Sequence, residues 1–235
     1  MKILIAEDEE ISRNMLQAAL EEWGHDVEVA CDGQEAWEAM QGSNAPQLAV
    51  LDWMMPEIEG PALCRALRKQ DRAEPLYLIL LTSKADGMDV FLGLEAGADD
   101  YISKPYDSKE LQARLNVGRR IIKLQRELQG RVKELTGVYN LSRLIQEKED
   151  LHQILQGTVD LIPDSLQYPG ISCVRLLVGD RTYTTQKYED TQWRLSRDIV
   201  VAKETIGTLD VCYLEERSQR DEGPFLKEEG YLITV

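Results

Sequence analysis

This chain has few histidines and no closely spaced pair of cysteines. Its 235 residues include two histidines and four scattered cysteines, with no Cys-x-x-Cys pair and no histidine at metal-ligand spacing. This pattern argues against a thiolate metal site, and nothing marks either histidine as the base that a catalytic cysteine needs. We therefore interpret the cysteines as reduced residues that fill the core: Cys31, Cys64, Cys173 and Cys212.

Long apolar runs are also missing. No stretch approaches the roughly 18 apolar residues of a membrane-spanning helix. The N-terminal segment MKILIAEDEE turns acidic too soon for a signal peptide. We therefore expect a soluble, cytoplasmic protein with no membrane partner.

Basic residues are in deficit. The chain has 42 acidic against 27 basic residues and a net charge of −15. A surface that binds nucleic acid through its phosphates needs clustered basic side chains. We therefore expect no nucleic-acid partner. A small basic module is still compatible with this net charge.

The chain is long enough for two modest domains, and its first half alternates short apolar runs with helical patterns. The apolar runs lie at residues 2–6, 26–30, 48–52, 76–82 and 100–103. Strands that alternate with helices predict a (βα)5 domain with a parallel sheet covered on both faces. In such a sheet the ligand site lies beyond the carboxyl ends of the strands.

Polar residues end or directly follow four of these expected strands. In chain order they are Glu7 with Asp8, Asp52, Thr82 with Ser83, and Lys104 with Pro105. Carboxylates gathered in one crevice repel one another unless a cation offsets their charge. Oxygen ligands that leave room for water suit Mg²⁺. The pattern predicts a magnesium site, although each residue alone has an ordinary alternative, such as a solvated strand end, a helix cap or a surface charge.

Four stretches in this order carry a specific resemblance: ILIAEDE, LDWMMPEIEG, LLTSKAD and LEAGADDYISKPYD. With this content and spacing, residues 1–118 resemble the receiver domain of two-component response regulators, the CheY-like family. The resemblance implies a flavodoxin-like, doubly wound sheet of five parallel strands. It also implies that Asp52 is the phospho-accepting nucleophile.

The resemblance implies a partner and a metal. A sensor histidine kinase or a phosphotransfer protein would supply the phosphoryl group from a phosphohistidine. Mg²⁺ would neutralise charge on the phosphoryl oxygens and on the acids. The residues implied to hold it are Glu7, Asp8, Asp52 and, through its backbone carbonyl, Met54.

The remaining matching residues have implied roles in switching. Thr82 would hydrogen-bond a phosphoryl oxygen, and its movement would leave room for Tyr101 to swing inward. Lys104 would balance negative charge as a compact ammonium, and its bond to Pro105 would be cis. Glu7 departs from many receivers, which have aspartate at this position, so somewhat altered metal geometry is expected.

A long proline-free segment follows at residues 108–147. Its apolar residues recur at steps of three and four: Leu111, Leu115, Ile121, Leu124, Leu128, Val132, Leu135 and Tyr139. This stripe predicts a helix too long for one small domain, with residues 119–147 as a helical linker. We favour a parallel dimeric coiled coil with a local stutter; the alternative is a helix that folds back onto the second domain. Bends or breaks are expected near the helix-weakening Gly118, Gly130 and Gly137.

Residues 148–235 predict an α+β domain. A helical segment up to Pro163 precedes extended runs at 171–179, 181–188, 192–202 and 207–216, which favour an antiparallel sheet; a final helical stretch is expected from Pro224. From about Leu135 the chain resembles a GAF domain in LSRLIQ, LHQILQGTVDLIPDSLQYP, IGTLDVCYLEER and DEGPFLKEE. The resemblance implies a sensory or regulatory role with an unknown ligand. The chain ends inside the expected closing helix, so a truncated domain is expected.

These features favour a response regulator of a phosphorelay, in which phosphorylation of Asp52 acts on a dimeric helix and a GAF-like domain. One alternative is the N-terminal regulatory fragment of a larger hybrid histidine kinase or cyclic-dinucleotide enzyme; another is a scaffold that is never phosphorylated. No GGDEF-, EAL- or HD-GYP-like run is present, and His152 is followed by Gln153 rather than by an acid. We therefore expect no separate catalytic domain and no enzyme activity beyond self-catalysed phosphoryl transfer.

Overall fold

The computed structural model describes residues 1–42, 44–70, 72, 74–83, 87–166, 168–216, 225 and 230, without the side chains of 87–90. The chain divides into two compact units, Met1–Glu127 and Leu128–Val235. The boundary falls within helix α5 (Ser108–Glu147), inside the segment expected to be a linker.

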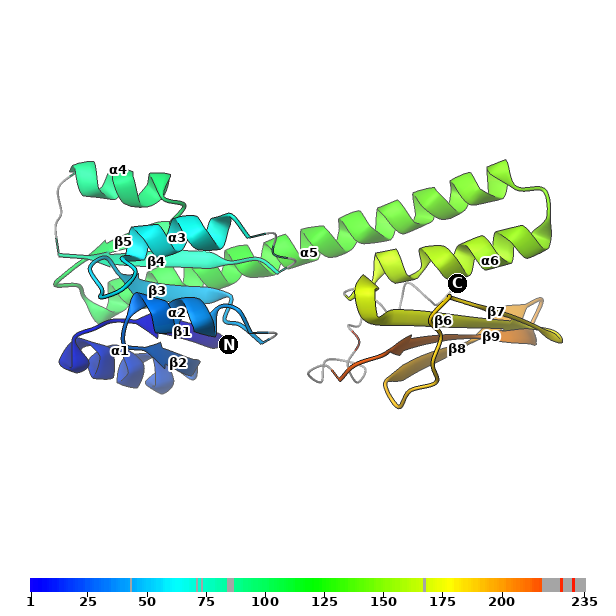
Figure 1. The fold of residues 1–235 in the computed structure, drawn as a ribbon, viewed down its shortest axis with the longest axis horizontal. Helices are drawn as coiled ribbons and strands as arrows, with labels where there is room; N and C mark the ends of the chain where they lie inside the picture. The colour runs from blue at the N-terminus through cyan, green and yellow to red at the C-terminus, as the bar shows by residue number, and fades with distance from the viewer. Residues whose placement is uncertain are drawn as a thin grey trace. The chain divides into compact units, whose positions relative to one another are not determined.

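The first unit contains the expected five-stranded parallel sheet (Figure 1). Its strands are β1 (Lys2–Ala6), β2 (Asp26–Ala30), β3 (Leu48–Asp52), β4 (Tyr77–Thr82) and β5 (Asp100–Ser103). They lie in the order β2-β1-β3-β4-β5, and all neighbouring pairs are parallel. The strand order therefore reverses between β1 and β3, where a ligand site is expected in such a sheet.

Helices cover both faces of this sheet. They are α1 (Glu10–Glu22), α2 (Gly33–Ala39), α3 (Gly60–Arg68), α4 (Gly87–Glu95) and the first part of α5. Successive residues of β1 point to opposite faces. Ile3 belongs to a buried cluster with Leu16 of α1 and Leu111 of α5. Leu4 belongs to a second cluster with Ala36 and with side chains of α3.

Helix α5 continues without interruption through the three glycines at which bends or breaks were expected. Gly118 is buried, and a Cβ built there would lie 2.6 Å from Cδ1 of Tyr77. Glycine therefore lets α5 approach the sheet closely. Gly130 differs, because no described heavy atom lies within 4 Å of a Cβ built there.

These two glycines predict opposite mutational effects. Gly118→Ala is expected to lower the free energy of unfolding by about 1–2 kcal/mol, because overpacking against Tyr77 outweighs the gain in helix propensity. Gly130→Ala is expected to raise it by up to about 1 kcal/mol, because only the propensity changes. Urea unfolding followed by circular dichroism measures both effects, and shifts of the same sign would contradict this explanation.

The second unit contains an antiparallel sheet, as expected. Its strands are β6 (Ser172–Val178), β7 (Arg181–Thr184), β8 (Arg194–Val201) and β9 (Glu204–Tyr213), in the order β7-β6-β9-β8. Helix α6 (Leu151–Leu161) and the short 3-10 helices η1 (Pro163–Ser165) and η2 (Pro169–Ile171) precede them. Val159 of α6 joins Val174, Val211 and Tyr213 in one buried cluster.

The expected final helical stretch lies almost wholly outside the described residues. Phe225 is described and buried, and its ring stacks on Tyr213 with a centroid distance of 4.5 Å. All four cysteines are free, and three of them are buried. The core-filling prediction is wrong for Cys31, which lies just beyond the end of β2 and is exposed. No helix in the described part of the chain has the length and apolar character that crossing a membrane requires.

Candidate functional site

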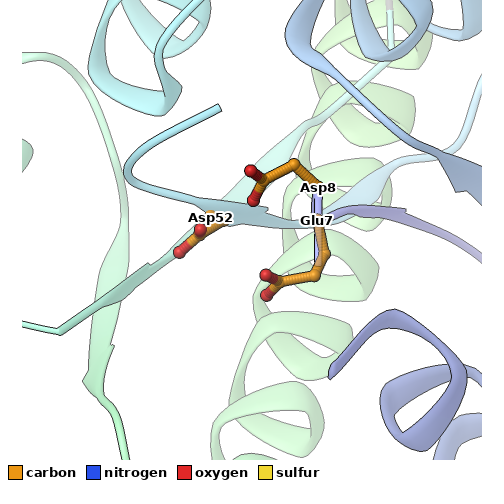
Figure 2. Close-up of side chains that lie close together, drawn as sticks. All are labelled: Glu7, Asp8 and Asp52. Atoms are coloured by element: carbon orange, nitrogen blue, oxygen red, sulfur yellow. The ribbon is translucent and has the colours of Figure 1, made fainter. Parts of the chain in front are cut away.

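Three acidic side chains meet at the carboxyl ends of β1 and β3. Glu7 and Asp8 directly follow β1, and Asp52 is the last residue of β3. One carboxylate oxygen of each lies within 4.8 Å of the others (Figure 2). Glu7 and Asp52 are buried, whereas Asp8 is exposed. The sheet therefore gathers carboxylate oxygens at a point that solvent still reaches.

Lys104 reaches the same point from the segment after β5. Its Nζ lies 2.6 Å from Oε2 of Glu7 and 3.0 Å from Oδ1 of Asp52. Its backbone N–H donates to the carbonyl of Thr82 at 2.6 Å, and its bond to Pro105 is cis. The ammonium thus lies between two buried carboxylates.

Burial and charge act against each other in this group. Burial raises the pKa of Glu7 and of Asp52, and the hydrogen bond from Lys104 offsets that rise only in part. Burial lowers the pKa of Lys104, but its hydrogen bonds to the two carboxylates outweigh burial, so this pKa is raised. One ammonium faces three acids, and the surplus of negative charge favours a further cation.

The structure places the other expected site residues at or near this edge of the sheet. Thr82 is buried at the end of β4, the strand next to β3. Ser83 follows it and is exposed. Tyr101 of β5 is half-buried and contacts one of the two core clusters. Met54 lies two residues after Asp52 and has an exposed side chain.

The segment after β3 approaches the strand closely where α3 begins. Gly60 donates its N–H to the carbonyl of Trp53 at 3.0 Å. A Cβ built at Gly60 would lie only 2.3 Å from the backbone oxygen of Asp52. The absence of a side chain at Gly60 therefore allows α3 to start against the end of the strand that carries Asp52.

Two residues near the site were not found by sequence reasoning. Nη1 of Arg13, on α1, donates to the backbone carbonyls of Glu7 at 2.8 Å and Asp8 at 2.9 Å. Tyr106 is half-buried, and its pKa is raised by burial, with a smaller influence from the charge of Lys104. Arg13 contacts main-chain atoms, so no pattern of side chains in the sequence indicates this contact.

The family model of the response regulator receiver domain matches residues 3–116. Residues 3–116 form a response regulator receiver domain. The expectation for the first half of the chain is therefore confirmed, whereas the GAF-like assignment of the second half stays a prediction.

The receiver domain is similar to the matching parts of curated regulators. It is 43% identical over 114 residues to the alkaline phosphatase synthesis transcriptional regulatory protein PhoP of Bacillus subtilis, covering 48% of this chain and 46% of PhoP. It is 44% identical over 123 residues to the probable transcriptional regulator ycf27 of Porphyridium aerugineum, and the match covers 52% of this chain and 50% of that regulator. The chain thus spans about half the length of the curated relatives it matches. Their names describe transcriptional regulators and give no support to the expected absence of a nucleic-acid partner.

Two solved receiver domains are also similar. The receiver domain of the Francisella response regulator 1452 is 34% identical, with a TM-score of 0.47, and the match covers 51% of this chain and 96% of that domain. The receiver domain of the sensor histidine kinase PA1611 from Pseudomonas aeruginosa PAO1 is 28% identical, with a TM-score of 0.46. The match covers 52% of this chain and 97% of that domain. That structure is described as having a magnesium ion coordinated in the active site cleft.

Proposed function

We propose that this chain is a response regulator of a two-component phosphorelay, with Asp52 as the residue that accepts the phosphoryl group. The observation that carries the proposal is the placement of Asp52 within a receiver domain, beside two further acids and 3.0 Å from the ammonium of Lys104. Receiver domains interact with histidine kinases, so the proposed donor is a phosphohistidine on such a kinase or on a phosphotransfer protein.

The proposed reaction is an in-line displacement at phosphorus. A carboxylate oxygen of Asp52 forms the new O–P bond, and the P–N bond to histidine breaks, with its electron pair leaving on the imidazole nitrogen. Lys104 stabilises the negative charge of the phosphoryl oxygens as a point charge. Thr82, at the end of the neighbouring strand, is the proposed hydrogen-bond donor to a phosphoryl oxygen, and Tyr101 is proposed to move inward in response.

The donor set fits Mg²⁺. Receiver domains bind Mg²⁺ at an acidic pocket, and the carboxylates of Glu7, Asp8 and Asp52 converge within 4.8 Å with one of them open to solvent. Mg²⁺ prefers such oxygen ligands and keeps several waters. The backbone carbonyl of Met54 is the proposed fourth protein ligand. When bound, the ion neutralises charge on the acids and on the phosphoryl oxygens.

Intact-mass measurement tests this proposal. Incubation with acetyl phosphate and Mg²⁺ is expected to add one phosphoryl group to the wild type and none to Asp52→Asn, which keeps the shape of the side chain and removes its nucleophilic charge. Chelation of Mg²⁺ is expected to prevent the gain in the wild type. If the wild type gains no phosphate, or if the variant gains as much, the proposal fails.

We also propose that α5 pairs with the same helix of a second copy of the chain. Seven large apolar side chains of α5 are more than half exposed, and the five that matter here are Leu124, Leu128, Val132, Leu135 and Tyr139. Their steps of three and four place them along one stripe of the helix. Another face of α5 contacts α6, because a Cβ at Gly157 would meet Leu144 at 2.7 Å. Packing onto α6 therefore leaves the stripe available for dimerisation.

Light scattering tests the dimer. The wild type is expected at twice the chain mass of 26.8 kDa, and Leu128→Glu is expected to shift it towards the monomer because it places a charge in the apolar stripe. Gln129→Glu adds the same charge at the neighbouring exposed position and is expected to leave the dimer intact. A wild type that stays monomeric with and without phosphorylation would refute the dimer.

The second unit is proposed to be a GAF-like sensory or regulatory module that receives the signal from the receiver domain through α5. Its antiparallel sheet, with α6 contacting one face, supports this assignment. The chain is further proposed to act as a phosphoprotein without a separate catalytic domain.

A further inference from the structure

We propose that Arg13 is a positioning residue, which holds the backbone after β1 in the turn that directs the carboxylates of Glu7 and Asp8 to the same Mg²⁺ site. The inference rests on the function proposed above, because it concerns the same metal site. It goes beyond that proposal by assigning a role to a residue outside the acid and lysine set.

The backbone must turn for two adjacent acids to share one site. In a strand, successive side chains point to opposite faces of the sheet. Carboxylate oxygens of Glu7 and Asp8 nevertheless both lie within 4.8 Å of an oxygen of Asp52 (Figure 2). The peptide between these two residues therefore departs from the geometry of β1, which ends at Ala6.

Arg13 binds this turn at the carbonyl groups. A single nitrogen, Nη1, donates to the carbonyl of Glu7 at 2.8 Å and to that of Asp8 at 2.9 Å. Along a strand, successive carbonyl groups point in opposite directions. Two successive carbonyls that accept from one nitrogen therefore do not follow strand geometry. The two hydrogen bonds thus favour the backbone conformation that brings both acids to Asp52.

Arg13 is well placed to act as a fixed support. It lies in the first part of α1, where its backbone N–H donates to the carbonyl of Glu9 at 2.9 Å. Leu16 and Leu20 of the same helix are buried in the core, so α1 is anchored to the sheet. The guanidinium therefore connects the metal-site turn to a rigid element.

The contribution of Arg13 is mainly geometric. Its Nη1 donates to the main-chain carbonyls of Glu7 and Asp8. Arg13 is expected to affect Mg²⁺ binding by orienting its ligands, as residues that orient metal ligands commonly do.

Calorimetric titration of the full chain with Mg²⁺, in the absence of any phosphodonor, tests this role. Arg13→Met has a similar length and no donor, and it is expected to weaken Mg²⁺ binding by about tenfold or more. Arg13→Lys keeps the charge and one donor nitrogen on a shorter side chain, so an intermediate affinity is expected. Arg120→Met removes the same charge from an exposed position of α5 and is expected to bind Mg²⁺ as the wild type does.

The outcomes separate this inference from the proposed function. If the wild type binds no Mg²⁺, the metal site itself fails. If the wild type binds Mg²⁺ and Arg13→Met binds it equally well, the positioning role is overturned while the phosphorelay proposal stands. Urea unfolding of each variant checks that the fold is retained. If Arg13→Met does not fold, Arg13→Lys decides, and an affinity equal to that of the wild type overturns the role.

Discussion

Replacement of Lys104 by methionine is expected to slow phosphate incorporation at Asp52 by about 100-fold or more. The ammonium of Lys104 lies 2.6 Å from Glu7 and 3.0 Å from Asp52, so in the proposed phosphoryl transfer it would stand beside the oxygens on which negative charge develops. Removal of one such fixed electrostatic group commonly costs about 10²–10³ in rate. Methionine fills a similar volume without the charge.

The rate of phosphate gain from acetyl phosphate, followed by intact mass in saturating Mg²⁺, measures this effect. Lys109→Met is the matched control. Lys109 is exposed in the first turn of α5, and its substitution removes the same charge. Its rate is expected to equal that of the wild type. Equal slowing in both variants would show that net charge, rather than the placement of Lys104, controls the reaction.

Gly60→Ala is expected to lower the free energy of unfolding of the receiver domain by about 3 kcal/mol. The new Cβ would lie 2.3 Å from the backbone oxygen of Asp52 and 2.8 Å from a methyl carbon of Leu80. Backbone atoms cannot rotate out of the way as the end of a flexible side chain can, so the start of α3 must shift. The shift would also move the segment that carries Met54.

Urea unfolding monitored by circular dichroism measures this loss. Gly42→Ala is the control in the same unit, since the nearest atom to a Cβ built there is 3.9 Å away. It is expected to change the free energy of unfolding by less than about 0.5 kcal/mol. A Gly60→Ala variant as stable as Gly42→Ala would contradict the close approach described for α3.

The strands of the receiver domain could be predicted almost to the residue because both faces of a parallel sheet are buried. Every residue of β3, LAVLD, is buried, so the run is continuously apolar until it reaches Asp52. The same topology brings the carboxyl ends of parallel strands to one edge. The convergence of Glu7, Asp8, Asp52 and Lys104 could therefore be predicted from the strand ends alone.

Contacts that depend on tertiary packing could not be predicted in this way. Helix propensity predicts a weak point at Gly118, but the environment of this residue is set by Tyr77 on a distant strand. Arg13 acts on carbonyl groups, which every residue carries, so its partners leave no pattern in the sequence. Residue type alone predicts a buried Cys31, yet this residue lies just past the end of β2 and is exposed.

In the second unit, too, some features could be predicted from the sequence and others could not. Apolar and extended runs indicated β6, β8 and β9, but the order β7-β6-β9-β8 depends on pairing between strands that are not adjacent in the chain. β7 ends at Thr184, earlier than its extended sequence indicated. The next residue, Thr185, still bonds to β6: its N–H donates to the carbonyl of Val174 at 3.0 Å, and its hydroxyl accepts from the N–H of Val174 at 3.1 Å.

Peptide mapping of the acyl phosphate tests the central claim most directly. After incubation with acetyl phosphate and Mg²⁺, borohydride reduction converts an aspartyl phosphate into a stable residue that mass spectrometry can locate. The proposed phosphorelay function predicts that the modified residue is Asp52 and that chelation of Mg²⁺ removes the modification. Modification at any other acid, or none in the folded wild type, would contradict it.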